Sequence, residues 1–249
     1  MDLVSDGVLC HRREASVGLV PVRRLAVVPA RGGSEGVPRK NLQVVAGQTL
    51  LARAVWCALA VGVFDEVMVS TDDDEIAGAG LLAGAAVPFR RSATASGDRA
   101  SSTDVLRDVL SAYDAVGTQF DLVALLEPTS PMRTADDIAR TVVAAEAEGW
   151  DAALTVSEVP TSYHPDKQFC LGAHGDAVFF TDAGPTIVAR QQLSPTYVRN
   201  GMCYAVRTLR IQEGGTIFGT RARAVVVDRP YVNIDSPEDI ARARQMLGP

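Results

Sequence analysis

Short apolar runs alternate with amphipathic stretches along most of this chain, and the alternation limits the fold more than any other feature. Apolar runs suited to buried strands cover residues 25–29, 66–70, 122–126 and 152–156. Between them lie stretches with one apolar face, such as residues 102–115, which predict helices. A β-α-β-α rhythm is typical of a mostly parallel sheet covered by helices on both faces. We therefore expect an α/β fold of three layers.

Sequences that favour helix N-termini mark three of the expected helices. Residues 71–74 read Thr-Asp-Asp-Asp, the pattern of a capped N-terminus, and the helix would begin at Ile76. Thr134 would cap a second helix. Ser236 followed by Pro237 is the strongest start, with serine as the cap and proline at the first helical position. Further strand candidates are residues 87–90, 202–208 and 224–228.

The rhythm breaks between about residues 160 and 200, where prolines punctuate short strand-like pieces such as residues 177–180. We interpret this region as an inserted arm or a small β subdomain. Residues 1–23 have the ragged composition of an N-terminal extension that is open to disorder. The main domain would then cover residues 24–249, with the arm inside it.

The charge balance and the cysteines exclude several classes of function. The chain has 30 acidic and 24 basic residues, whereas a broad nucleic-acid interface needs a basic face. A local cluster of basic side chains can still bind a small anion. No signal peptide or membrane-length apolar run is present, and Cys10, Cys57, Cys170 and Cys203 stand too far apart for a zinc site or redox pair. We expect a cytoplasmic protein without nucleic-acid or membrane partners.

The loop after the first predicted strand is the strongest functional signal. Residues 29–41 read PARGGSEGVPRKN, and ligands of α/β sheets bind at the carboxyl ends of strands. Three glycines allow backbone N–H groups to approach phosphate oxygens, and Arg31, Arg39 and Lys40 add positive charge. The loop matches neither the Walker A nor the GxGxxG pattern. Its composition leaves two interpretations open, a triphosphate-binding loop and an exposed basic turn.

This loop resembles the opening motif of the acylneuraminate cytidylyltransferases, the CMP-sialic acid synthetase family, which reads roughly PAR-x-x-S-K-G-x-P-x-K-N. The resemblance implies a Rossmann-like, GT-A-like nucleotidyltransferase domain in which Arg31, Ser34 and Lys40 hold the phosphates of CTP. Glu35 departs from the pattern, because the family usually has lysine there. The matching positions are Pro29, Ala30, Arg31, Ser34, Gly36, Pro38, Lys40 and Asn41.

A second segment, residues 91–102, resembles the part of the family that contacts cytosine and ribose. Ser101 and Ser102 would be the base contacts, although a serine there can equally be an ordinary helix N-cap. The nucleotide-binding residues implied by the resemblance are Ala30, Arg31, Gly32, Gly33, Ser34, Lys40, Asn41, Arg91, Ser101 and Ser102.

Three further segments resemble the sugar-binding parts of the family. Residues 125–133 read LLEPTSPMR against the family's LLQPTSPLR, so Glu127 replaces a glutamine thought to contact the sugar. This exchange predicts an altered sugar specificity. In the arm, HPDK and RQQL resemble the family's HP-x-K and RQ-x-LP, and such arms swap across a homodimer in the family. The implied substrate-binding residues are Glu127, Thr129, Lys167, Arg190 and Asn200.

The segment Asn233-Ile234-Asp235 resembles the family's D-x-D, whose carboxylates bind Mg²⁺. Alternate residues of an extended segment point the same way, so Asn233 and Asp235 share a face. Asn233 supplies a neutral oxygen and would bind a hard cation more weakly than aspartate. Without the resemblance, Asp235 would be interpreted as a helix-start residue.

Together these segments predict transfer of CMP from CTP to a sialic-acid-like 2-keto sugar acid, with release of pyrophosphate. Arg31, Lys40 and Asp235 are the expected catalytic residues, with Mg²⁺ as cofactor. Three alternatives stay open: another acidic acceptor such as a different nonulosonic acid or a phosphonate, a non-catalytic nucleotide-binding relative, and a glycosyltransferase. The enzyme interpretation requires the loop of Arg31 and the segment of Asp235 to meet.

Overall fold

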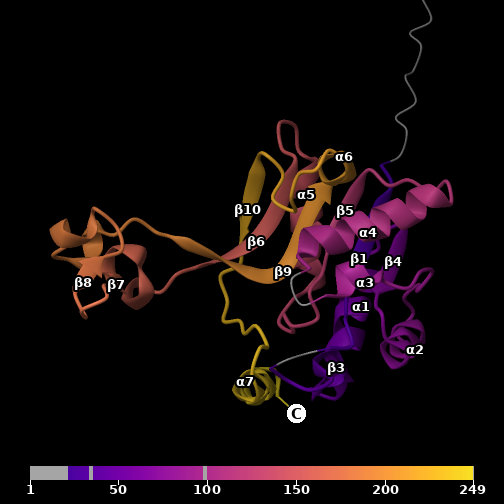
Figure 1. Cartoon of the computed structure of the whole chain (residues 1–249), viewed down its shortest axis with the longest axis horizontal. Helices are drawn as coiled ribbons and strands as arrows, with labels where there is room; N and C mark the ends of the chain where they lie inside the picture. Colours follow the sequence, from indigo (N-terminus) through magenta and orange to yellow (C-terminus); the bar gives the residue numbers. More distant parts are fainter. Residues whose placement is uncertain (1–21, 34–35, 98–99, 249) are drawn as a thin grey trace, which may run out of the picture.

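A six-stranded sheet forms the centre of the protein in a computed structural model that describes residues 22–33, 36–97 and 100–248 (Figure 1). Its strand order is β10-β6-β9-β5-β1-β4. Only β9 runs antiparallel to its neighbours, so the predicted mostly parallel α/β sheet is confirmed. The strands are β1 (Arg24–Pro29), β4 (Glu66–Ser70), β5 (Leu122–Leu125), β6 (Ala152–Glu158), β9 (Tyr197–Arg207) and β10 (Ala222–Val226).

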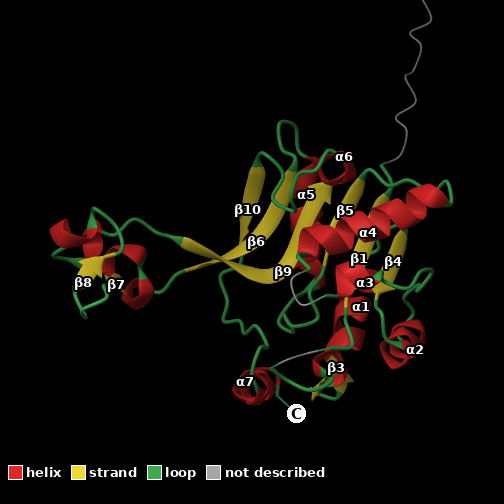
Figure 2. Ribbon diagram, viewed as in Figure 1, coloured by secondary structure: helices red, strands yellow, loops and turns green. Residues whose placement is uncertain are grey.

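Helices cover both faces of this sheet, as Figure 2 shows. Successive side chains of a strand point to opposite faces. Ala26 and Val28 of β1 therefore join one apolar core with α1 and α5, and Leu25 and Val27 join a second core with α4 and α6. The helices are α1 (Leu50–Val61), α2 (Asp74–Leu82), α3 (Ala93–Ser96), α4 (Ser102–Ala115), α5 (Ala135–Glu146), α6 (Thr208–Gln212) and α7 (Pro237–Leu247). None of these described helices is long and apolar enough to cross a membrane.

Two of the three predicted helix starts are confirmed. Thr134 and Ser236 are the N-caps of α5 and α7. The third start is wrong, because Asp73 caps α2 by accepting a hydrogen bond from the backbone N–H of Ile76 at 2.9 Å. Three aspartates follow Thr71, and each of them could also serve as the N-cap. A carboxylate is at least as good a cap as a threonine hydroxyl.

The remaining strand predictions need three corrections. Residues 87–90 form no strand, since this part of the chain has only isolated bridges, at Ala86 and at Arg90. Strand β9 begins at Tyr197 and β10 ends at Val226, whereas the expected strands were 202–208 and 224–228. The short hairpin of β2 (Val44–Val45) and β3 (Gln48–Thr49) was not predicted.

An arm leaves the body between β6 and β9 and projects well away from the sheet (Figure 1). It contains a small antiparallel pair, β7 (Phe169–Leu171) and β8 (Ala177–Phe179). Large apolar side chains of the arm are exposed, including Leu171 at 78% and Val188 at 88%. A surface of this kind is typical of a contact with another molecule or another copy of the chain. The rest of the arm consists of the short 3-10 turns Thr161–Tyr163, Pro165–Lys167, Gly184–Thr186 and Arg190–Gln192.

Candidate active site

The loop after β1 and the segment before α7 meet, although they are almost two hundred residues apart in sequence. The Nζ atom of Lys40 donates a hydrogen bond to Oδ1 of Asp235 at 3.1 Å. At Gly36, an added Cβ would lie 2.3 Å from the carbonyl oxygen of Asp235, so the close approach requires glycine. The predicted phosphate-binding loop and the predicted metal-binding residue therefore belong to one site.

Internal hydrogen bonds fix the first half of this loop. The side-chain amide of Asn41 donates to the carbonyl oxygen of Arg31 at 3.1 Å. The backbone N–H of Gly32 donates to Asp72 Oδ1 at 2.9 Å, which ties the loop to the end of β4. Ala30 is fully buried and its N–H bonds to the sheet, so it supports the loop from below. The exposed Gly33 follows these fixed residues, and Ser34 and Glu35 lie outside the described residues.

Arg39 does not add its charge to the loop as expected. Its guanidinium forms salt bridges with Asp73, at 2.6 Å, and with Glu75 at the start of α2. Its backbone is left-handed, with φ of 52°, and this conformation turns the side chain of Arg39 and that of Lys40 to different partners. Arg31 and Lys40 thus remain the cations of this loop that are predicted to bind phosphates, and Lys40 is paired with the exposed carboxylate of Asp235.

Arg91 lies buried beneath the carboxyl ends of β1 and β4. It donates through Nε to Ser70 Oγ at 3.1 Å and also bonds the carbonyl oxygen of Ser70. Burial lowers the pKa of Arg91 to about 10, and the nearby charge of Arg31 acts in the same direction. The side chain stays protonated at neutral pH, so Arg91 places a second positive charge next to Arg31.

The two serines predicted to contact the base differ in their surroundings. Ser101 is the N-cap of α4, and its hydroxyl donates to Asp104 Oδ2 at 2.7 Å in a capping box. The ordinary N-cap interpretation therefore describes Ser101. Both serines line a cavity of about 540 Å³, and Ser102 also lines a smaller cavity of about 190 Å³ together with Glu127 and Asn233.

This cavity, called the Glu127 cavity below, brings together residues from five parts of the chain. Sequence reasoning singled out three of its lining residues and missed Arg199, whose only signal was its place directly before Asn200 and Gly201. The lining consists of Ser102, Glu127, Arg199, Gly201, Tyr204, Ile217 and Asn233.

A dense set of contacts holds the floor of the Glu127 cavity. Ser130 Oγ donates to Asn233 Oδ1 at 2.8 Å. The buried guanidinium of Arg133 bonds the carbonyl oxygens of Glu127 and Met202. Gly201 has φ of 72°, and an added Cβ would lie 2.7 Å from Ser130 Oγ and 2.9 Å from Glu127 Oε2. The end of β5, the kinked strand β9 and the segment before α7 are thereby locked together.

Thr129 and Asn200 contribute to this floor through other groups than expected. The carbonyl oxygen of Thr129 accepts from the N–H of Ile234 at 2.9 Å. Asn200 is fully buried, and its side chain donates to Ser157 Oγ at 3.0 Å and accepts from the N–H of Met202 at 3.2 Å. Both residues have structural roles, and their direct contact with substrate stays a prediction.

Lys167 and Arg190 are exposed on the arm and line none of the cavities described here. Within one chain the structure does not bring them to Glu127 or Asp235. Their role in binding the sugar acid therefore stays a prediction that depends on a second copy of the chain.

The carboxyl of Glu127 is mostly buried, and burial raises its pKa above the ordinary value, against the opposing effect of Arg133 and Arg199. A raised carboxyl pKa means that the folded state binds the proton more tightly, so this group lowers stability as pH rises. We expect Glu127→Gln to be more stable than wild type by about 1 kcal/mol at pH 7. The difference should vanish below about pH 4, where Glu127 is neutral in both states.

Urea unfolding at several pH values measures this difference, with the exposed Glu148→Gln as the matched control. The control should stay within about 0.5 kcal/mol of wild type at every pH. A wild-type protein more stable than Glu127→Gln at pH 7 would contradict the expected burial effect.

The residues near Asp235 fit a magnesium ion that is shared with a substrate. Mg²⁺ is commonly held by one or two carboxylates plus substrate phosphates. The side chain of Asp235 is 82% exposed, and Asn233 Oδ1 keeps a second lone pair beside its bond from Ser130. Within the described part of the chain no group of three or more His, Cys, Asp or Glu side chains forms a complete metal cage. Any ion here would therefore need phosphate or water ligands as well.

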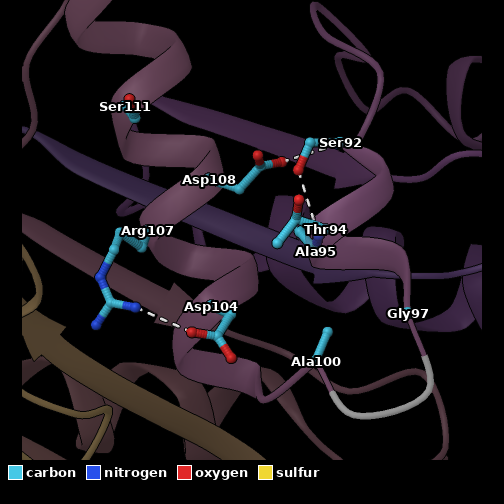
Figure 3. A pocket seen from close by; sticks show the side chains of 9 residues that line it. All are labelled: Ser92, Thr94, Ala95, Gly97, Ala100, Asp104, Arg107, Asp108 and Ser111. Carbon is cyan, nitrogen blue, oxygen red and sulfur yellow. Dashed lines mark hydrogen bonds and ion pairs between the residues drawn. The ribbon is translucent and has the colours of Figure 1, made fainter.

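A larger cavity of about 580 Å³ lies between α3 and α4 (Figure 3). Its charged groups are already paired, since Asp108 accepts from the N–H of Ser92 and Arg107 bonds Asp104 at 2.9 Å. Ala95, Gly97 and Ala100 line it and belong to the segment predicted to contact cytosine and ribose, although none of the individually predicted site residues does. The predicted catalytic residues lie elsewhere, so the candidate active site is the region of Lys40, Asp235 and the Glu127 cavity.

A glycine-rich basic loop after the first strand of a mostly parallel sheet, close to an exposed carboxylate, is an arrangement suited to binding a nucleotide. The chain belongs to the cytidylyltransferase family, whose model matches residues 25–213. This match confirms the resemblance found in the motifs and shows that the protein is an enzyme of the nucleotidyltransferase class.

Relatives and solved structures agree with this assignment. CMP-N,N'-diacetyllegionaminic acid synthase of Legionella pneumophila is 30% identical over 91% of this chain and 97% of its own length. N-acylneuraminate cytidylyltransferase of Streptococcus agalactiae is 28% identical over 88% of this chain and 52% of its own. The solved structure of CMP:2-keto-3-deoxy-manno-octonic acid synthetase complexed with CTP has a TM-score of 0.68 at 20% identity and covers 90% of this chain and 98% of that one. The last comparison supports the fold.

Proposed function

We propose that the protein transfers CMP from CTP to a nonulosonic acid, a sialic-acid-like 2-keto sugar acid, and releases pyrophosphate. The observation that carries the proposal is the meeting of Lys40 with Asp235 beside the Glu127 cavity. A triphosphate needs the cations of the loop, and the cavity offers polar groups for a hydroxylated ligand. Relatives named for legionaminic, pseudaminic and N-acylneuraminic acids have sugar acids of this class as substrates.

The reaction follows from the arrangement of these groups. The anomeric hydroxyl of the sugar acid attacks the α-phosphorus, a new P–O bond forms, and the bond to pyrophosphate breaks. Arg31 and Lys40 would neutralise the phosphate charge that grows on the leaving group. Asp235 and Asn233 would hold Mg²⁺, which supplies charge neutralisation and orientation when bound. The proton of the attacking hydroxyl passes to solvent water as the P–O bond forms.

Pyrophosphate release from each of the four nucleoside triphosphates, measured with a panel of sugar acids, tests the proposal. We expect release only with CTP and only when a 2-keto sugar acid is present. Tight CTP binding without release for any acceptor would instead favour a non-catalytic relative. Activity with phosphonates or other small acids would show that the reaction is a CMP transfer but that the acceptor is not a sugar acid of this class.

We also propose that the arm completes the site of a second copy in a homodimer. The exposed apolar side chains of the arm, its projection away from the sheet (Figure 1) and the absence of Lys167 and Arg190 from the lining of the Glu127 cavity support this arrangement. A cytoplasmic location stays a prediction.

Mixing two inactive variants tests the exchange of arms. Lys167→Ala lacks an arm contact and Asp235→Asn lacks a body contact, so each homodimer should be inactive. Refolding them together should restore about a quarter of the wild-type activity, because half of the dimers are mixed and one of their two sites is intact. No recovery, with Lys167→Ala alone inactive, would show that the arm acts within its own chain.

A further inference from the structure

Arg199 lines the Glu127 cavity and has no salt-bridge partner in the part of the chain that the structure describes. It lies on β9 opposite Val156 of β6. Its guanidinium stands 5.9 Å from the ring centroid of Phe218, and among the described residues it forms no hydrogen bond or salt bridge. Arginine side chains usually bind a carboxylate or water. A guanidinium that lines a cavity without such a partner among the described residues can therefore bind a ligand.

The carboxylate of Glu127 lines the same cavity in a similar state. In the described part of the chain its two carboxylate oxygens accept no hydrogen bond, and only its backbone oxygen is bonded, by Arg133 and by the N–H of Ser130. Glu127 and Arg199 influence each other electrostatically and yet form no salt bridge. The cavity between them therefore has a negative pole and a positive pole with room for a polar group.

The size of the Glu127 cavity limits what this group can be. About 190 Å³ corresponds to roughly six water molecules at about 30 Å³ each. This volume suits one substituent of a sugar acid, and a neighbouring cavity of about 540 Å³, which shares Ser102, Arg199 and Ile217 with it, has room for more of the ligand. Glu127 can only accept hydrogen bonds when ionised, and Arg199 can only donate. A planar group with an N–H donor and a carbonyl acceptor satisfies both poles at once.

We propose that Arg199 is an acceptor-binding residue, and that Glu127 and Arg199 together bind an acylamino substituent of the sugar acid. The acyl carbonyl oxygen accepts from Arg199, and the amide N–H donates to Glu127. The assignment rests on the proposed function, and it adds a specificity determinant that the motifs did not reveal. The ring of Phe218, with its centroid 5.9 Å from the guanidinium, adds a cation–π contact.

The test compares an N-acylated acceptor with the same sugar acid carrying a free amine. In Arg199→Ala, kcat/KM for the acylated acceptor should fall about tenfold or more, the loss of a charge-assisted hydrogen bond. For the amine, which has no carbonyl oxygen to offer, kcat/KM should stay within about threefold of wild type. Arg199→Lys keeps the charge without the planar fork, so its kcat/KM for the acylated acceptor should lie between that of wild type and that of Arg199→Ala.

Arg223→Ala is the matched control, because Arg223 is also an arginine on a strand, with its guanidinium 6.0 Å from the ring centroid of Trp150, and lines none of the described cavities. It should leave both acceptors unchanged. Equal losses for the two acceptors, or a rise in the KM of CTP in place of that of the acceptor, would overturn the assignment. Wild-type turnover of the acylated acceptor tests the proposed function separately, so an unchanged Arg199→Ala would overturn this inference alone.

Discussion

Replacing Asp235 with asparagine should lower kcat by about a hundred- to a thousandfold, the usual cost of removing a group that stabilises charge at the reacting centre. The side chain of Asp235 is 82% exposed, and its partner is the ammonium of Lys40. Losing the carboxylate of Asp235 should therefore lower the free energy of unfolding only slightly, since exposed ion pairs contribute about 1 kcal/mol or less. What the variant loses is a negative charge that can bind a cation beside the phosphates.

Steady-state kinetics across a magnesium titration measures this effect. Asp235→Asn should need more Mg²⁺ for half-maximal rate, because an amide oxygen binds a hard cation more weakly than a carboxylate. Asp74→Asn is the control, since Asp74 is also exposed and paired with an arginine, Arg90, at 2.6 Å. A variant with wild-type rate and magnesium dependence would show that Asp235 is not a metal ligand.

Replacing Gly36 with alanine should reduce kcat/KM by about a hundredfold, because a shift of about 1 Å in a positioned group can have that effect. The new Cβ would lie 2.3 Å from the carbonyl oxygen of Asp235, a distance that backbone atoms cannot accept. Either the loop after β1 or the segment before α7 must move. Both movements separate Lys40 from Asp235.

Gly78→Ala provides the comparison for this change. Gly78 lies inside α2, and nothing stands within 4 Å of a Cβ added there. Alanine at that site should preserve activity and raise stability slightly. Circular dichroism and thermal unfolding of Gly36→Ala separate loss of geometry from loss of fold. Full activity in this variant would mean that the contact with Asp235 is not required.

Local sequence patterns were sufficient for most of the sheet and for the loop after β1. Strand β1 consists of buried apolar residues, and a fully buried central strand has that composition. The capped starts of α5 and α7 were equally local, because Thr134 and Ser236 each have an acid three residues later. The strand predicted at residues 87–90 was wrong because a short apolar stretch also suits a partly exposed connection that makes only isolated bridges to β4 and its end.

Contacts between distant segments could not be derived from local patterns. Nothing near Arg39 in sequence indicates that it will bind Asp73, and the loop alone gives it the same role as Lys40. The meeting of Lys40 with Asp235 came only from resemblance to a family. Arg199 was missed because a single arginine on a strand is most often a solvated surface charge.

Strand β9 connects the arm directly to the reaction centre. Its first residues leave the body with the arm, and its later residues run through the middle of the sheet past Gly201. Arg199 lies at the junction, just before a change of pairing register with β6. An arm docked on a second copy of the chain would therefore restrict the motion of the Arg199 side chain. A ligand bound in the Glu127 cavity would in turn favour docking of the arm. Assembly of two subunits and selection of the acceptor would then be one linked equilibrium, in which each event strengthens the other.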